Sequence, residues 1–330
     1  MRGFTPLLCV GAGVLAASHL TAQQIASPAV LPEASQPAIP SASPTPDVLD
    51  FGQRSDRMTV PVTIGPHGPF PFIVDTGAER SVVSRELAGL LKLSLGAPAR
   101  VFDFTGPADV STVKVPSLTA GALGTNDMEA PQLLMADIGA PGMLGIDALQ
   151  GQSIVLDFYR KRMTLKRARR HASGDVVVSA KSRTGQLIVT KAWFNDHPIA
   201  VIIDTGSWLS VGNNAMLRLA KRAPRSYGPV VVTAVTGRSF TSDFVTVSDV
   251  RVGTVNFNNF GMVFADVPPF SRFGLRDQPA LILGMSSLKL FSRVELDFVN
   301  REVGFTMARK GIDVHDTCRT SAACRSISTS

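Results

Sequence analysis

Short runs of β-branched and aliphatic residues alternate with turn residues along most of the chain, which predicts many short strands. The clearest pattern is a strand, a turn and a second strand, followed by a short helical segment, and it occurs twice. Ser84 and Asn214 are the expected N-caps of the two helices. The strand, turn, strand and helix are predicted at 58–64, 65–68, 70–74 and 84–91, and again at 187–194, 195–198, 199–203 and 214–220.

The order of the later segments is also repeated, which indicates an internal duplication. Each copy continues with a Thr-Gly pair between extended segments, a β-rich run, an apolar run that ends in glycine, and a ten-residue block that aligns without gaps. In the first copy these are Thr105-Gly106, 113–115, 143–145 and 156–165; in the second they are Thr236-Gly237, 244–247, 281–284 and 296–305.

Length and composition agree with two β-rich domains. The chain has 330 residues, which suggests about two domains of roughly 150 residues each. Turn residues and Val and Thr are frequent, as an all-β chain requires. Zinc-protease, serine-hydrolase, dinucleotide-binding and phosphate-loop motifs are all missing from the sequence.

The candidate chemistry lies in two Asp-Thr-Gly motifs, 129 residues apart, each at the end of an apolar run. An isolated motif of this kind can simply be a tight turn. Two carboxylates that meet across a pseudo-twofold axis, however, can share one proton and activate water. The duplicated context therefore favours Asp75 and Asp204 as a catalytic pair. We expect Asp147, Asp157 and Asp297 to be structural.

From about residue 50 to 310 the chain resembles the bacterial retropepsin-like aspartic proteases, in a version with two motifs in one chain. The resemblance depends on the segments 75–78, 204–207, 144–147 and 283–286. It implies an all-β fold of two pseudo-symmetric six-stranded β-barrel lobes with the active site between them. It also implies that Thr76 and Thr205 brace the two loops, which include Gly77 and Gly206, and that Gly145 and Gly284 pack beside them.

The resemblance further implies that Ala78 and Ser207 each lie beside the carboxylate of their own lobe. We expect the Ser207 hydroxyl to donate a hydrogen bond to Asp204, which Ala78 cannot do for Asp75. Neither Tyr159 nor Tyr227 lies in a candidate flap, so a pepsin-like flap tyrosine is not expected. Paired flaps with tips at Thr105-Gly106 and Thr236-Gly237 fit better.

These features predict an exported aspartic endopeptidase that acts as a monomer, binds its polypeptide substrate in extended form, and needs no metal or cofactor. Two alternatives come from other classes. One is a catalytically idle peptide-binding or scaffold protein on the same fold, for which loss of an Asp or Gly from a motif would be the expected signature. The other is a periplasmic binding or structural β-protein in which the motifs only shape turns.

The ends of the chain predict processing and tethering segments. Residues 1–22 have the pattern of a cleaved secretory signal peptide, with an uncleaved membrane anchor as the alternative. Residues 23–48 are rich in Pro, Ala and Ser and are expected to be a tether, or else a removable pro-segment. The lobes are expected at 49–170 and 171–312, and a tail at 313–330.

Two features outside the motifs concern cysteine and charge. Cys318 and Cys324 in the tail are expected to form a disulfide, with a metal pair as the alternative. Much of the net charge of +7 lies in a basic cluster at 160–170. This cluster is either a solvated hairpin and inter-lobe linker, or a weak contact with an anionic envelope surface (lipid or peptidoglycan) or with an acidic substrate. Nucleic acid is not an expected partner.

Overall fold

The structure is a computed structural model, and it describes residues 47–50, 52–54, 57–121, 123–149, 151–166, 171–183 and 185–307. Several sequence predictions lie outside these residues: the signal peptide, the tether up to residue 46, the tail with Cys318 and Cys324, and the basic residues 167–170. The structure is mostly β, with 55% strand and 11% helix. None of the helices in the described part is long and apolar enough to cross a membrane.

The first half contains a closed six-strand barrel. Its strand order is β3-β4-β10-β5-β9-β8, and antiparallel pairing of β3 with β8 closes the circle. The barrel strands are β3 (Arg57–Ile64), β4 (His67–Val74), β5 (Val82–Ser84), β8 (Thr112–Ala120), β9 (Leu123–Leu133) and β10 (Gly142–Leu144), with β2 (Gly52–Arg54) added to β3. The helices are α1 (Arg85–Leu90), α2 (Met135–Ile138) and α3 (Ile146–Leu149).

The second half shows the corresponding strand order, β14-β15-β22-β16-β21-β18, inside a fifteen-strand sheet. These strands are β14 (Gln186–Phe194), β15 (His197–Ile203), β16 (Val211–Gly212), β18 (Ser239–Val247), β21 (Phe260–Phe264) and β22 (Ala280–Leu283). They are accompanied by β17 (Arg225–Thr233), β19 (Val250–Val252), β20 (Val255–Phe257), α4 (Asn214–Leu217), α5 (Pro268–Arg272) and α6 (Met285–Leu288). The predicted hairpins at 58–74 and 187–203 are thus confirmed.

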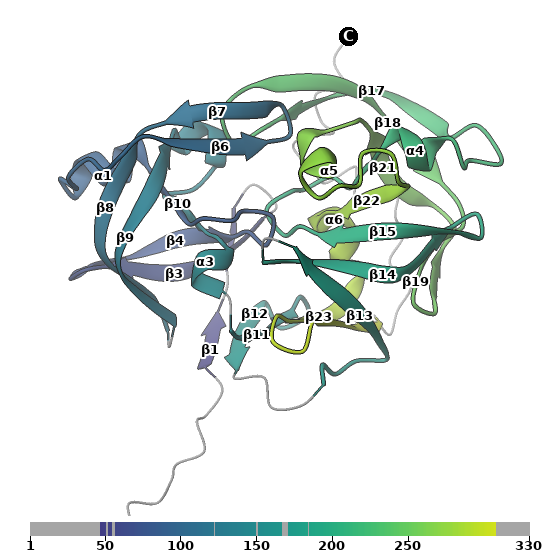
Figure 1. The fold of residues 1–330 in the computed structure, drawn as a ribbon. Coiled ribbons are helices and arrows are strands. Elements are labelled where there is room, and N and C mark those ends of the chain that lie inside the picture. The colour runs from purple at the N-terminus through teal and green to yellow at the C-terminus, as the bar shows by residue number, and fades with distance from the viewer. Residues whose placement is uncertain are drawn as a thin grey trace, which may run out of the picture. The chain divides into compact units, whose positions relative to one another are not determined.

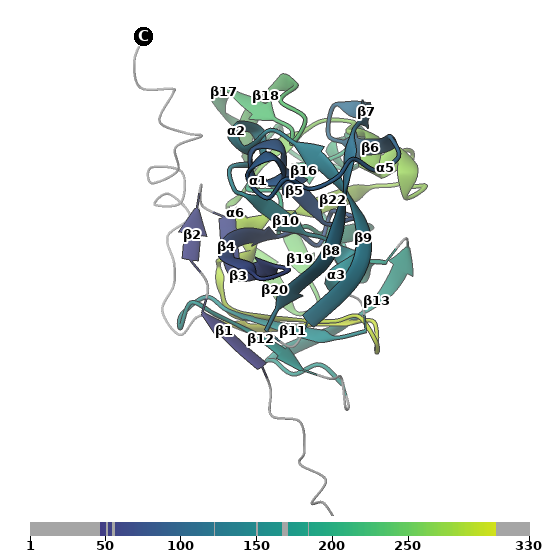
Figure 2. The ribbon, with the colours of Figure 1, turned by 90° about the vertical axis from the view of Figure 1, so that its left-hand side faces the viewer.

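The two halves are joined by a run of strands that the sequence did not predict as one sheet. Its order is β1-β12-β11-β23-β24-β13. Figure 1 and Figure 2 show its strands β1, β11, β12 and β13 together at the lower end of both views. The strands are β1 (Asp47–Asp50), β11 (Ser153–Asp157), β12 (Arg162–Lys166), β13 (Val176–Arg183), β23 (Phe291–Asp297) and β24 (Glu302–Met307). The central pair, β11 with β23, is antiparallel and places Val155 opposite Glu295. The two repeated ten-residue blocks begin within these strands, where Leu156 lies opposite Val294 and Leu296 lies opposite Ile154.

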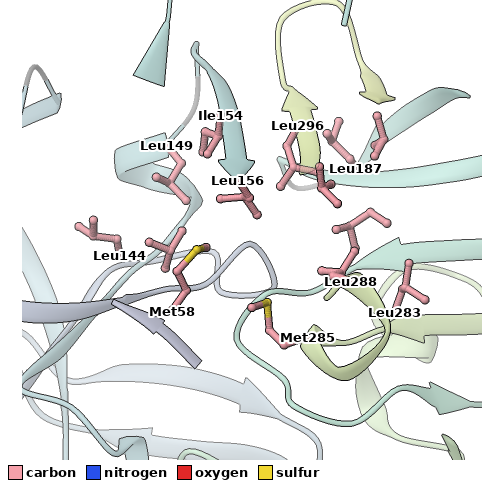
Figure 3. Close-up of a cluster of buried hydrophobic side chains, with 14 of the residues drawn as sticks. Met58, Leu144, Leu149, Ile154, Leu156, Leu187, Leu283, Met285, Leu288 and Leu296 are labelled. Carbon is pink, nitrogen blue, oxygen red and sulfur yellow. The ribbon is translucent and has the colours of Figure 1, made fainter. Parts of the chain in front are cut away.

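A shared apolar core lies above this joining sheet. It takes buried side chains from both halves, and Figure 3 shows them gathered between the two sets of strands. Leu156 and Leu296, from the paired strands β11 and β23, are both almost fully buried. The labelled members are Met58, Leu144, Leu149, Ile154 and Leu156 from the first half, and Leu187, Leu283, Met285, Leu288 and Leu296 from the second. Burial of this cluster holds the halves together through the hydrophobic effect.

The helix starts differ in one respect from the prediction. Ser84 is the N-cap of α1, as expected, and its Oγ accepts a hydrogen bond from Leu87 N at 3.1 Å. The N-cap of α4 is Asn213 and not Asn214, because Asn213 Oδ1 accepts from Met216 N at 2.9 Å. The Asn213 amide also donates to the carbonyl oxygens of Leu275 and Gln278. Because Asn213 makes these hydrogen bonds, the N-cap of α4 lies one residue earlier than predicted.

Candidate active site

Each Asp-Thr-Gly motif begins where a pair of parallel strands ends. In the first half β4 pairs with β10, and Asp75 N donates to the carbonyl oxygen of Leu144 at 2.9 Å. In the second half β15 pairs with β22, and Asp204 N donates to Leu283 O at 3.1 Å. The last three residues of β4 and of β15 are buried, so the two loops start from rigid supports.

The two aspartates are held by the same backbone donors. Gly77 N and Ala78 N donate to Asp75 Oδ1 at 2.8 and 3.0 Å. In the other loop the N–H groups of the two corresponding residues, Gly206 and Ser207, donate to Asp204 Oδ1 at 2.9 and 3.0 Å. Asp75 and Asp204 are only 6% and 8% exposed. Each loop thus fixes one carboxylate in a nearly buried position.

The glycine of each motif lies against the carboxylate of the other motif. A Cβ atom added to Gly77 would lie 2.7 Å from Asp204 Cγ, and one added to Gly206 would lie 2.1 Å from Asp75 Cγ. Real Cβ atoms do not approach other heavy atoms this closely, so only glycine fits at either position. The reciprocal packing brings both carboxylates to one point between the halves.

The two threonines of the motifs connect the loops by crossed hydrogen bonds. Thr76 Oγ1 donates to Ile203 O at 2.9 Å, and Thr205 Oγ1 donates to Val74 O at 2.7 Å. Each hydroxyl also accepts from the backbone N–H of the other threonine, at 3.0 and 3.1 Å. Both threonines are buried. These four bonds fix the position of one loop relative to the other.

Gly145 and Gly284 lie directly beside the two loops. A Cβ atom on Gly145 would lie 2.5 Å from the backbone of Arg80, and one on Gly284 would lie 2.5 Å from Leu209 O. In addition, Ile146 N donates to Ala78 O, and Met285 N donates to Ser207 O, both at 2.9 Å. The segments after β10 and β22 therefore support the ends of the loops that carry the aspartates.

Two buried serines, which the sequence analysis missed, connect these supports to the loops. Gly145 N donates to Ser81 Oγ at 3.0 Å, and Gly284 N donates to Ser210 Oγ at 3.1 Å. Ser81 Oγ in turn donates to Asp147 at 2.7 Å, which gives Asp147 a structural role. Each serine stands six residues after its aspartate, and this repeated spacing is the signal that could have identified the pair.

A third residue that the sequence did not single out is Gln186, at the start of β14. It is 1% exposed, and its Nε2 donates to the carbonyl oxygen of Gly77 at 3.1 Å. Gln186 also lines the cleft described below. A side chain of the second half thus supports the glycine of the first motif.

The hydrogen bonding of Ser207, the residue after the second motif, differs from the expectation based on the sequence. Ser207 Oγ donates to the carbonyl oxygen of Leu209 at 2.8 Å, so this hydroxyl proton is directed away from Asp204. The expected donation from Ser207 to Asp204 is therefore wrong. The hydroxyl bonds instead to a carbonyl oxygen two residues further along the same turn. Ala78 and Ser207 instead contribute equivalent backbone N–H groups.

A cleft of about 690 Å³ opens above the two aspartates. Its walls come from both halves, and its roof includes two hairpins, β6–β7 and β17–β18. We call the hairpin of β6 (Ala99–Asp103) and β7 (Gly106–Val110) the first flap hairpin, and that of β17 and β18 the second flap hairpin. Figure 1 shows the first flap hairpin reaching from the first half toward α5 of the second.

The tips of the two flap hairpins touch, and they contain the four predicted flap residues. Thr105 lies in the turn of the first hairpin and Gly106 begins β7, while Thr236 and Gly237 lie in the turn of the second. Thr236 Oγ1 donates to Asp103 Oδ2, and Arg238 Nη2 donates to Gly106 O at 3.0 Å. The tips also cross over: Phe104 packs on an apolar cluster of the second half, and Val235 packs on one of the first half.

Both flap hairpins therefore cover the cleft, one from each half. The first covers it with residues on and beside β6, and the second with residues at the end of β17 and in its turn. Within the described residues, no group of three or more His, Cys, Asp or Glu side chains is placed to hold a metal ion.

Comparison with known proteins gave two family matches. Residues 60–151 match the family described as gag-polyprotein putative aspartyl protease, and residues 190–287 match the family described as aspartyl protease. Each matched segment contains one Asp-Thr-Gly motif. No curated protein matches the chain.

Proposed function

Because the chain belongs to the retropepsin-like aspartyl proteases, with two such domains in one chain, we propose that it is an endopeptidase in which Asp75 and Asp204 activate water together. The observation that carries this proposal is the reciprocal packing of each motif glycine against the opposite carboxylate. This packing brings two nearly buried acids to one point at the floor of a cleft.

The proposed mechanism follows from the closeness of the two acids. Two adjacent carboxyl groups cannot both ionise at low cost, so they hold one proton between them. The ionised member takes a proton from a bound water, and the water attacks the carbonyl carbon of the scissile peptide bond. The protonated member donates to the carbonyl oxygen, and a proton then passes to the leaving nitrogen. The titration belongs to the pair as a whole.

The surroundings support the pair in two ways. The crossed threonine bonds keep the loops at a constant separation, and the flap hairpins cover the cleft. Exclusion of bulk water strengthens electrostatic interactions at the reacting atoms. We propose that the substrate is a polypeptide in extended form, bound along the floor beneath the flap hairpins by strand-like hydrogen bonds.

We further propose that the second half is a barrel related to the first by a pseudo-twofold axis. The equivalent strand order supports this relation, as does the pairing of β19, which follows β18, with β14. In the first half the corresponding contact is the one that closes the barrel, β8 with β3.

The test is hydrolysis of a peptide library by the wild type, Asp75→Asn, Asp204→Asn and the double variant. Each substitution should abolish cleavage, and the losses should not add, since either one removes the shared-proton site. Asp127→Asn is the matched control, because Asp127 is exposed and does not line the cleft. Peptide binding without cleavage by the folded wild type would instead support a non-catalytic peptide-binding protein.

A further inference from the structure

The cleft is more acidic than the protein around it. The chain as a whole has a net charge of +7, but five acidic and only three basic side chains line the cleft. The acidic ones are Asp75, Glu79, Asp103, Asp137 and Asp204, and the basic ones are Arg80, Arg100 and Arg272. This excess of carboxylates favours cationic groups in the ligand.

Outside the catalytic pair, almost all of these charges have partners within the protein. Arg272 pairs with Glu79, Arg238 pairs with Asp103, and Arg100 pairs with Asp109. Arg80 donates to the backbone oxygen of Glu129. Among the described residues, Asp137 is the one charged side chain of the cleft for which the structure shows neither a side-chain hydrogen bond nor an ion pair.

The position of Asp137 is well defined by its neighbours in α2. The next residue, Ile138, is fully buried in the apolar cluster of the first half, and Gly139 ends the helix in the left-handed conformation. Asp137 itself is half-buried and lines the cleft. Because the helix is anchored through Ile138, the carboxylate is held at the cleft wall.

The tip of the second flap hairpin lies over this carboxylate. A Cβ atom on Gly237 would lie 2.7 Å from Asp137 Oδ2, and Gly237 has a φ of +82°, which also favours glycine. The flap backbone thus approaches Asp137 closely and shields it from part of the solvent. A partly desolvated carboxylate without a partner is costly, and a ligand cation would supply the missing interaction.

We propose that Asp137 is a specificity-determining residue, which selects substrates with a Lys or Arg side chain at one position near the scissile bond. The inference rests on the proposed function, since it concerns the same cleft. Lys and Arg are the peptide side chains that can donate charged hydrogen bonds to a carboxylate at neutral pH. A purely structural role for Asp137 would affect stability but not the choice between substrates.

The experiment compares peptides that differ only in Lys or norleucine, placed in turn at each position around the scissile bond. For the wild type we expect kcat/KM to be about tenfold higher with Lys at one position, as one charged hydrogen bond would give. Asp137→Asn should remove this preference, mainly by raising KM for the Lys peptide, so that the ratio of kcat/KM between the Lys and norleucine peptides falls to about one. Asp137→Lys should shift the preference to Glu. Asp127→Asn is the control and should keep the wild-type preference.

The two proposals can fail separately. If peptides are cleaved but Asp137→Asn keeps the Lys preference, the role of Asp137 is overturned and the protease stands. A binding assay in the Asp75→Asn background covers the other case. If nothing is cleaved, yet Lys peptides bind more tightly than norleucine peptides and Asp137→Asn abolishes the difference, the protease proposal fails and the role of Asp137 stands. Equal binding of the two peptides in that assay would overturn the role of Asp137.

Discussion

Arg272 and Glu79 form a bidentate ion pair across the cleft: Arg272 Nε lies 2.8 Å from Glu79 Oε1, and Arg272 Nη2 lies 2.6 Å from Glu79 Oε2. Glu79 follows the first motif, whereas Arg272 ends α5 of the second half. The guanidinium carbon also lies 4.5 Å from the ring centroid of Phe102 in the first flap hairpin. One side chain thus contacts the floor loop and the roof.

Arg272→Met is expected to lower kcat/KM about tenfold, because a 1 Å shift of a flap or floor residue is enough for such a loss. The free energy of unfolding should fall by less than about 1 kcal/mol, since both partners are about one-third exposed. Steady-state kinetics and urea unfolding give the two values. Lys221→Met, which breaks an exposed ion pair with Asp196, should change neither. If the kinetic effects of Arg272→Met and Glu79→Gln simply add in the double variant, the two side chains do not act as a pair.

Gly77→Ala and Gly206→Ala are each expected to abolish cleavage, because the new methyl group would occupy the space of the opposite carboxylate. The displaced Asp204 or Asp75 could no longer share its proton. Hydrolysis rates and circular dichroism of the variants would check this. Gly89→Ala is the matched control: it lies in α1 with nothing within 4 Å of the added atom, so it should leave activity intact and raise stability slightly. Normal activity in Gly206→Ala would show that the loops do not meet as described.

Thr205→Val is expected to destabilise the protein by about 2 kcal/mol or more, since it leaves the buried groups Val74 O and Thr76 N without a partner. Thr205→Ser keeps the hydroxyl, so its loss of stability should be much smaller. Denaturant unfolding of both variants measures the difference. Equal losses in the two variants would mean that the methyl group, and not the hydrogen bonds, stabilises the loops.

Glu295, in the joining sheet, should make stability depend on acid pH. Burial raises the pKa of this carboxyl, but hydrogen bonds from Lys166 and Ser173 and the charge of Lys166 more than offset burial, and the pKa is lower than usual. A lowered folded-state pKa contributes stability that is present above the unfolded pKa, about 4.3 for Glu, and is lost as the pH falls toward the folded value.

Unfolding measured as a function of pH would test this contribution. Glu295→Gln should be less stable than the wild type at neutral pH, and the gap should close as the pH falls below about 4. Asp127→Asn, at an exposed position, serves as the control. If the difference in stability between the wild type and Glu295→Gln stays constant at acid pH, the lowered pKa of Glu295 would be contradicted.

The protein is expected to cleave substrate as a monomer, because both aspartates are in one chain and β11 pairs with β23 within it. Activity per molecule should then stay constant on dilution, in contrast to a homodimeric protease, which loses activity as it dissociates. Rates measured over a wide concentration range, together with sedimentation, would check this. A steep fall in specific activity while the protein stays folded would refute it.

The local features of the fold were predictable from the sequence because turn residues punctuate it. The turns at Gly65-Pro66 and Asn195-Asp196 placed the flanking strands within three residues of their observed ends. The motif loops could be predicted because Asp-Thr-Gly has a distinct chemistry and occurs twice. The expected signal peptide, tether, disulfide and export lie outside the described residues and stay predictions.

Features that depend on distant contacts could not be predicted. The pairing of β11 with β23 joins residues far apart in sequence, and nothing in either strand alone specifies the other as its neighbour. Ser81 and Ser210 were overlooked because serine is common; their shared spacing from the aspartates was the available signal, and their burial and hydrogen bonds reveal their role. The Ser207 hydroxyl was misassigned because two acceptors compete for it, and the backbone of its own turn decides between them.

The joining sheet has a consequence for how the cleft can evolve. In a homodimer each substitution appears on both sides of the twofold axis, so the unliganded cleft is symmetric. Such a cleft binds a peptide equally well in either orientation. Here the halves are one chain, and they have already diverged. The residue four positions after the aspartate is Glu79 in the first half and Trp208 in the second. Each end of the cleft can therefore change independently, and a substrate can be held in a single orientation.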